Sequence, residues 1–171
     1  MRAKKTLRAI IIVAVLLSNI GCDQISKTIV RRTIDYNQKI GMVSNYLTLT
    51  RVENSGAFLS VGNSLSNPIK IILLSIFPLV AIGCALLFLV RSTDISKITL
   101  IGLSFIIGGG IGNIYDRIVH GSVTDFLHIN FVIFQTGIFN MADLSIMMGT
   151  FLILAQSFFK LTRVIPSKWK G

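Results

Sequence analysis

Four long stretches without a charged side chain limit what this 171-residue chain can fold into. A helix that crosses a bilayer needs about 20 largely apolar residues, and these stretches approach that length once their polar ends are included. We therefore predict an all-α membrane protein with four transmembrane helices. The predicted spans cover about 7–27, 68–90, 98–115 and 140–160.

The composition favours a membrane protein over a soluble one. Hydrophobic residues make up 52% of the chain and charged residues only 14%, whereas a soluble domain has about 25% charged residues. The net charge of +10 would suit a nucleic-acid partner, but too little of the chain is polar to form a basic soluble face. We predict one integral membrane domain, 1–171, with no nucleic-acid partner.

The basic residues are distributed unevenly between the two predicted sides. The N-terminal arm, the 91–97 link and the tail from Lys160 hold ten of the seventeen Lys and Arg residues and only one acid, Asp94. Loops rich in Lys and Arg stay in the cytoplasm. Both termini are therefore predicted to be cytoplasmic, and regions 28–67 and 116–139 face outward.

The first predicted span has two interpretations. Its basic start and apolar middle, followed by Gly21–Cys22, also fit a cleaved bacterial lipoprotein signal with Cys22 as the lipidated residue. We favour an uncleaved span, because the helical pattern continues past Cys22 and Lys27 can extend its ammonium group outward. Cys22 and Cys84 are expected to be buried free thiols.

The outward region 28–67 contains a predicted β segment. Residues Tyr46–Val52 alternate apolar and polar side chains, which is typical of a strand. Glu53–Gly56 then predicts a turn, and a second short strand is expected at Ala57–Val61. This β region could hold a substrate backbone by strand addition, or it could be a small packed structural element outside the membrane.

Glycine and proline give expectations for the second and third spans. Gly102, Gly108 and Gly112 recur at helical spacing, which favours close packing against another helix. Gly108–Gly110 is expected to loosen the third helix near its outer end. Pro78 predicts a kink in the second span.

Six of the seven acidic residues lie on the predicted outer side, and four of them have a structural interpretation. Asp143 would complement the start of the fourth helix in a capping box with Asn140. Asp125 could be a plain loop carboxylate. Asp116 suits a helix-end charge pair, and Asp23 suits an ion pair with the lysine four residues further on.

Asp125 and Asp143 also have a joint chemical interpretation. Two carboxylates within hydrogen-bond reach share one proton, so that one acts as a base and the other as an acid. This arrangement can activate water and polarise a peptide carbonyl. A Ser–Lys enzyme fits poorly, since the adjacent Ser26 and Lys27 diverge on a helix. His120 and His128 lack the pattern of a zinc site.

Four separated motifs resemble those of bacterial lipoprotein signal peptidase, also called signal peptidase II. They match the family patterns D-Q-x-[ST]-K, N-[ST]-G-A, G-N-x-x-D-R with V-x-D-F, and F-N-x-A-D. In this sequence they are Asp23–Lys27, Asn54–Ala57, Gly112–Arg117 with Val123–Phe126, and Phe139–Asp143. One departure is that Phe58–Leu59 follows Ala57, where the family commonly has Ala-Phe.

The resemblance implies a globomycin-sensitive aspartic endopeptidase of the bacterial inner membrane, without metal or cofactor. It implies that Asp125 and Asp143 cleave diacylglyceryl-modified prolipoproteins, among membrane lipids, on the N-terminal side of the lipidated cysteine. Its other implied site residues are Asp23, Lys27, Asn54, Gly56, Asn113, Arg117 and Asn140.

Two further hypotheses remain open from the residues alone. A small transporter or ion-coupled channel could use the aspartates as cation or proton ligands, although no acid lies near the middle of a span. A cleaved lipoprotein would lose Met1–Gly21, so the N-terminal sequence of the mature chain distinguishes it.

Overall fold

The computed structural model of the chain describes residues 2–43, 46–57, 62, 64–131 and 133–164. Within these residues, four helical runs are long and apolar enough to cross a membrane. They are α1 (Arg2–Thr33); α2 (Asn67–Ile71) continued by η2 (Ile72–Ile76) and α3 (Phe77–Arg91); α4 (Lys97–His120); and α5 (Met141–Val164). The prediction of four long apolar helices is confirmed.

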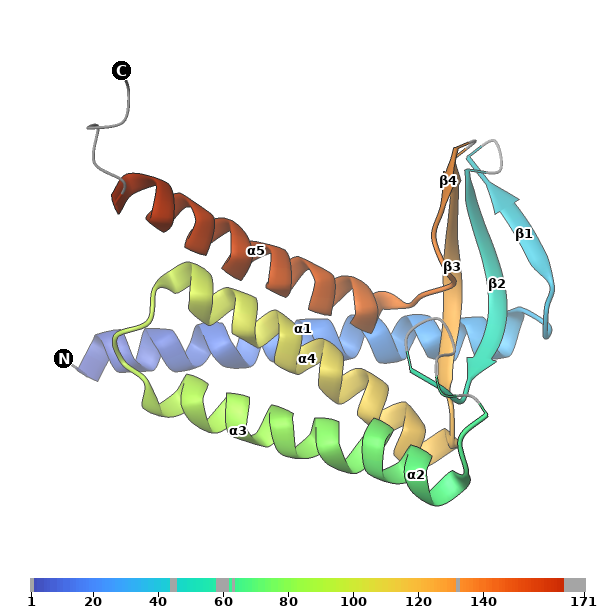
Figure 1. The fold of residues 1–171 in the computed structure, drawn as a ribbon, viewed down its shortest axis with the longest axis horizontal. Helices are drawn as coiled ribbons and strands as arrows, with labels where there is room; N and C mark the ends of the chain where they lie inside the picture. The colour runs from blue at the N-terminus through green and yellow to red at the C-terminus, as the bar shows by residue number, and fades with distance from the viewer. Residues whose placement is uncertain (1, 44–45, 58–61, 63, 132, 165–171) are drawn as a thin grey trace.

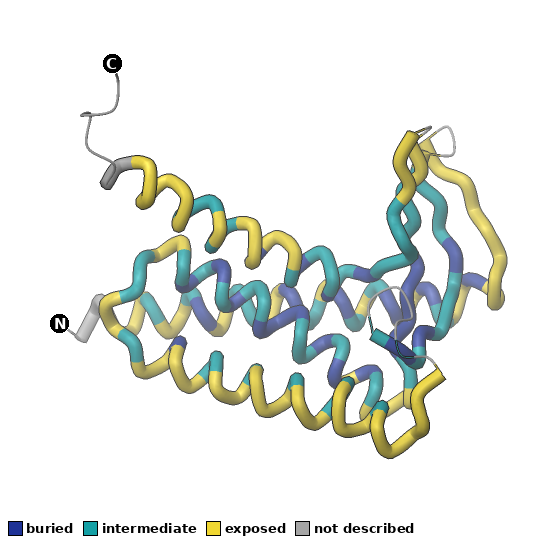
Figure 2. The backbone as a smooth tube through the Cα atoms, in the orientation of Figure 1, coloured by how far each residue is buried: buried dark blue, intermediate teal, exposed yellow. Residues whose placement is uncertain are grey.

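Helix α4 lies at the centre of the helices and packs against α1, α3 and α5 (Figure 1). Its buried residues contrast with the exposed outer faces of α3 and α5 (Figure 2). Many of the exposed side chains are large and apolar, such as Phe77 on α3 and Phe151 on α5. An apolar surface of this extent suits contact with lipid rather than water.

Glycines on α4 allow this close packing. An added Cβ at Gly109 would collide with the carbonyl oxygen of Ala142, and one at Gly102 would lie 2.9 Å from the carbonyl oxygen of Gly149. The predicted close packing of the glycine face of the third span is confirmed, since Gly108 also faces α1 at Asn19.

The predicted loosening near Gly108–Gly110 is wrong, because α4 continues as an α-helix to His120. The glycines are held between neighbouring helices, and this packing offsets their low helix propensity. The sequence predicts a kink at Pro78 in the second helical run. Just before Pro78, this run is π-helical over Ile72–Ile76, and this π-helical segment is the distortion in that part of the helix. Cys22 and Cys84 are unpaired, as predicted, but they are exposed rather than buried.

A small antiparallel sheet lies across one end of the helices (Figure 1). Its strands follow the order β1 (Lys39–Met42), β2 (Leu47–Asn54), β3 (Val123–Phe131) and β4 (Phe134–Gln135). The central pair aligns Val52 with Asp125 and Asn54 with Val123, after an irregularity between Leu49 and Val52. The β2–β3 pairing therefore joins the two regions predicted to face outward.

The sequence predicts only part of this sheet. The strand predicted at Tyr46–Val52 corresponds to β2, but the β region is not confined to the segment between the first two spans. β3 and β4 come from the segment between α4 and α5. Gly56 and Ala57 form a bend, and the rest of the second strand predicted at Ala57–Val61 lies outside the described residues, as does Phe58–Leu59.

Candidate active site

Asp125 and Asp143 line the same pocket, although they come from different elements. Asp125 is on β3, and Asp143 is in the first turn of α5. The pocket has a volume of about 320 Å³. It is lined by Asn54, Ala57, Leu73, Leu74, Phe77, Pro78, Asn113, Arg117, Val123, Asp125 and Asp143.

The Asp125 carboxylate is buried and held by two amide groups. Its Oδ2 accepts a hydrogen bond from Asn54 Nδ2 at 2.9 Å, and its Oδ1 accepts one from Asn140 Nδ2 at 2.7 Å. Burial raises the pKa of Asp125 to about 6, and the nearby charge of Asp143 also raises it, while the two amides oppose the change. Asp125 therefore retains its proton to a higher pH than an ordinary aspartate does.

Asp143 is half-buried and belongs to a capping box at the start of α5. Its backbone N–H donates to Asn140 Oδ1 at 3.0 Å, and Asn140 N donates back to Asp143 Oδ2 at 3.3 Å. The other carboxylate oxygen, Oδ1, accepts a hydrogen bond from Asn113 Nδ2 at 2.8 Å. These hydrogen bonds fix the position of the Asp143 side chain at the start of α5. The predicted capping box is confirmed.

Asn113 and Asn140 connect the two aspartates. Asn140 Nδ2 donates both to Asp125 Oδ1 and to Asn113 Oδ1, the latter at 3.2 Å. Asn113 in turn donates to Asp143. An amide side chain has separate donor and acceptor ends, so each contact fixes which end faces the next residue. The pair of carboxylates is thus held by one chain of oriented amides.

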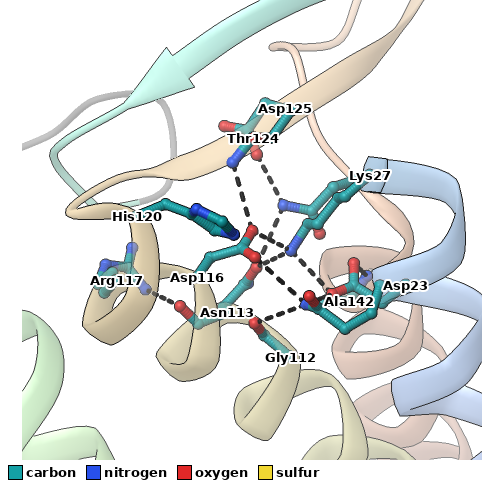
Figure 3. A network of polar contacts seen from close by, with 12 residues as sticks. Asp23, Lys27, Gly112, Asn113, Asp116, Arg117, His120, Thr124, Asp125 and Ala142 are labelled. Carbon is teal, nitrogen blue, oxygen red and sulfur yellow. Dashed lines mark hydrogen bonds and ion pairs between the residues drawn. The ribbon is translucent and has the colours of Figure 1, made fainter. Parts of the chain in front are cut away.

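A buried ionic cluster lies beside Asn113 (Figure 3). Lys27 has no exposed side-chain surface, and its Nζ lies 2.8 Å from Asp23 Oδ2 and 2.9 Å from Asp116 Oδ2. Asp116 also pairs with Arg31 at 3.0 Å. The predicted Asp23–Lys27 pair is confirmed, but Lys27 does not extend outward, because two carboxylates and the Asn113 side-chain oxygen surround its ammonium group.

The ionic cluster also fixes the ends of the elements that carry the aspartates. Asp23 Oδ1 accepts a hydrogen bond from Ala142 N at 2.9 Å, next to Asp143 in the sequence. Asp116 Oδ2 accepts a longer one, 3.4 Å, from Thr124 N, which precedes Asp125 (Figure 3). Helices α1 and α4 therefore position the starts of α5 and β3.

Arg117 joins the pocket to the turn after β2. Its Nη2 donates to the carbonyl oxygen of Gly56 at 2.9 Å, while Gly56 N donates to Asn54 Oδ1 at 2.9 Å. Asn54 can therefore present its Nδ2 group to Asp125. The structure thus brings together every site residue named from the sequence.

Three other residues, Arg31, Glu53 and Thr124, support the site and were not among the site residues predicted from the sequence. Thr124 Oγ1 donates to Glu53 Oε1 at 2.9 Å and accepts from Arg31 Nε at 2.8 Å. Thr124 is the variable position of the V-x-D-F motif and Glu53 directly precedes the N-[ST]-G-A motif, and these positions are the available signal. Arg31 lies one helical turn after Lys27, so its proximity to Asp116 depends on the packing of α1 against α4.

Comparisons with known proteins agree on one family. The family model described as signal peptidase (SPase) II matches residues 12–159. A lipoprotein signal peptidase of Streptococcus pneumoniae is 33% identical over 147 residues, which cover 86% of this chain and 91% of the relative. One from Listeria monocytogenes is 31% identical over 142 residues, covering 83% and 89%.

Solved structures share the fold. A structure titled as a bacterial membrane enzyme has a TM-score of 0.79 and 24% identity, covering 92% of each chain. A second structure with the same description has a TM-score of 0.76, also with 24% identity, and covers 85% of this chain and 91% of that one. At this identity they are informative about the fold alone. From the family model and the sequence relatives, the chain belongs to the signal peptidase II family and is a bacterial membrane protein.

Proposed function

We propose that this chain is an aspartic endopeptidase that removes the signal peptide from diacylglyceryl-modified prolipoproteins. The cut falls on the N-terminal side of the lipidated cysteine. The observation that carries the proposal is that Asp125 and Asp143 line one pocket and are joined through two oriented amides. The lipoprotein signal peptidases among the relatives support the substrate class.

In the proposed mechanism, Asp125 is the acid and Asp143 is the base. The raised pKa of Asp125 favours its protonated form, which suits the acid, and Asp143, which accepts hydrogen bonds from Asn113 Nδ2 and Asn140 N, is assigned the role of base. Asp143 takes a proton from water, which attacks the scissile carbonyl carbon, while Asp125 donates a proton to the carbonyl oxygen. Asp143 then gives its proton to the amide nitrogen, the carbonyl re-forms as its hydroxyl proton returns to Asp125, and the C–N bond breaks to release the amine. The pair supplies all of these proton transfers, so the proposed reaction needs no metal or cofactor.

The other site residues have positioning roles in this proposal. Asn54, Asn113 and Asn140 orient the two carboxyl groups. Arg117 and Gly56 hold the turn beside the pocket, and its apolar wall, which includes Leu73 and Phe77, suits the apolar part of a lipidated substrate. Asp23 and Lys27 act through the amides and through the start of α5.

We further propose that residues 1–171 form one domain of the bacterial cytoplasmic membrane. Both termini face the cytoplasm, and the pocket lies near the outer surface among membrane lipids. The uneven distribution of Lys and Arg supports this orientation. Globomycin-type peptides are proposed to inhibit by occupying the pocket. Six of the seven acids lie on the side predicted to face outward and none lies mid-span, which favours a peptidase over a transporter.

The test is cleavage by the purified full chain in detergent micelles. A diacylglyceryl-modified prolipoprotein should give a product that begins at the lipidated cysteine, identified by mass spectrometry. Asp143→Asn should abolish the product, whereas Asp35→Asn, an exposed acid outside the pocket, should leave it unchanged. Product formation by the Asp143 variant would contradict the aspartic mechanism, and equal cleavage of an unmodified precursor would contradict the lipidated substrate.

A further inference from the structure

The free end of the sheet carries a group of exposed apolar side chains, here called the sheet tip. Its residues are Val43, Tyr46, Phe131, Ile133 and Phe134. Ile133 is 98% exposed, Val43 71% and Phe134 62%. The two hairpins meet at this tip, because Asn130 N donates to the Tyr46 carbonyl oxygen at 2.8 Å and the Tyr46 and Phe131 rings lie 5.9 Å apart.

The sheet tip lies in a part of the chain without charged side chains. Residues 40–50 and 126–142 contain no Asp, Glu, Lys or Arg. The opposite end of the sheet lies beside charged groups, including Glu53 and Arg51, which pair at 3.5 Å. The sheet is therefore charged at its end near α1 and α4 and uncharged at its free end. Exposed aromatic and aliphatic groups without nearby charge are unfavourable in water but suit a lipid surface.

The position of the sheet brings this tip beyond the start of α5 (Figure 1). The strands run across the direction of the helices, and the free ends of the hairpins project past α5 (Figure 1). Strand β4 is on the side of the sheet toward the helices, and β1 is on the side away from them. Residues 136–140 alone connect β4 to α5, and Phe139 is tied to Leu127 of β3 by backbone hydrogen bonds of 2.8 and 2.9 Å.

We propose that the sheet tip inserts into the headgroup region of the leaflet next to the start of α5. The occupant of this apolar surface is membrane lipid, because α5 is itself a candidate span and the tip overhangs its end. Aromatic side chains concentrate at this depth, and interfacial segments bury their apolar face by about 5–10 Å. The anchor holds β3, and with it Asp125, at the bilayer surface.

This inference concerns the placement of the chain in the bilayer and stands whether or not the aspartates are catalytic. Its test uses tryptophan fluorescence in the full chain. Trp169 is the single tryptophan, so Trp169→Phe provides the background. Phe134→Trp on β4 reports the tip, Ile40→Trp on β1 is the control within the same sheet, and Phe151→Trp on α5 is the lipid-exposed reference.

Each variant is reconstituted in phosphatidylethanolamine–phosphatidylglycerol vesicles containing brominated phospholipid. For Phe134→Trp we expect quenching several-fold greater than for Ile40→Trp, and strongest with bromine near the headgroup end of the acyl chain. Phe151→Trp should be quenched by deeper bromine. Circular dichroism establishes that each variant keeps its helices.

Two results would overturn the inference. Quenching of Phe134→Trp that does not exceed that of Ile40→Trp, with equal access to aqueous acrylamide, would place the tip in water. Protection of Phe134→Trp from both lipid bromine and acrylamide would mean that protein covers the tip, either a second copy or another partner.

Discussion

The ammonium nitrogen Nζ of Lys27 lies 3.0 Å from the side-chain oxygen Oδ1 of Asn113. An ammonium group only donates hydrogen bonds, so this contact requires the Asn113 oxygen to face Lys27 and its Nδ2 group to face Asp143. Asn140 donates to the same oxygen and to Asp125. The buried ammonium group of Lys27 therefore determines that Asp143 faces the Nδ2 end of Asn113 and that Asp125 faces the Nδ2 end of Asn140.

Removing this cation should destabilise the fold. In Lys27→Met, the carboxylates of Asp23 and Asp116 lose the cation between them, and breaking a buried ion pair costs about 3–5 kcal/mol. Thermal unfolding in micelles measures the loss. The control Lys39→Met removes an exposed charge from β1 and should change the free energy of unfolding by less than about 0.5 kcal/mol. Equal effects of the two substitutions would show that the cluster does not stabilise the chain.

Asn113→Asp tests the amide orientation separately. The new carboxylate keeps an acceptor for Lys27 but replaces the donor to Asp143 with a negative charge. The Asp143 carboxylate would then lose a hydrogen bond and have a like charge beside it, so it should be held less well as the proposed base. The rate should fall by at least about tenfold, since general acid–base catalysis contributes about 10²–10⁴-fold.

The matched control for this prediction is Asn67→Asp, which adds the same charge at an exposed position at the start of α2. Its rate should equal that of the unmodified chain. A rate for Asn113→Asp that stays close to that of the unmodified chain would count against a role of Asn113 in holding Asp143.

Stability should depend on pH through Asp125. Burial raises its pKa from the ordinary 3.8 to about 6, so the folded state binds this proton more tightly than the unfolded state does. The contribution of Asp125 to the free energy of unfolding is therefore greatest below pH 4 and is lost as the pH rises through 6. At about 1.4 kcal/mol per pKa unit, the total change is about 3 kcal/mol.

The difference between the unmodified chain and Asp125→Asn isolates this contribution, because asparagine does not titrate. Unfolding measured at several pH values should show the unmodified chain losing stability relative to the variant between pH 4 and 7. A difference that stays constant over this interval would mean that Asp125 titrates alike in both states.

Gly109→Ala should separate α4 from the start of α5. The added Cβ would collide with the carbonyl oxygen of Ala142, next to Asp143, so both stability and activity should fall. Overpacking of this kind costs about 1–3 kcal/mol. Gly21→Ala is the control, since a Cβ there meets nothing within 4 Å and alanine favours the helix by about 1 kcal/mol. Similar losses in both variants would contradict the packing argument.

Local sequence patterns predict the elements of this fold better than their contacts. The uncharged stretches predict the four long helices, and the alternation at Tyr46–Val52 predicts β2. β3 carries apolar side chains on both faces together with Asp125, so its alternation is weak. Its pairing with β2 joins residues about seventy positions apart, and a single sequence does not specify such a contact.

The same limit applies to the candidate site. The Asp23–Lys27 pair follows from helical spacing, and so does the capping box of Asn140 and Asp143. The burial of Lys27 depends on Asp116, which lies on a different helix. From the sequence of α1 alone, a lysine near a helix end is expected to extend its ammonium group outward. The prediction for the Lys27 side chain was wrong because the sequence does not show that Asp116 lies next to it.

The most direct test of the proposed acid pair is single-turnover cleavage of a diacylglyceryl-modified prolipoprotein by four forms of the chain: unmodified, Asp125→Asn, Asp143→Asn and the double variant. Groups that act as a unit have non-additive effects. Each single substitution should therefore reduce the rate nearly as far as the double substitution does. If either single variant keeps a rate close to that of the unmodified chain, Asp125 and Asp143 are not the catalytic pair.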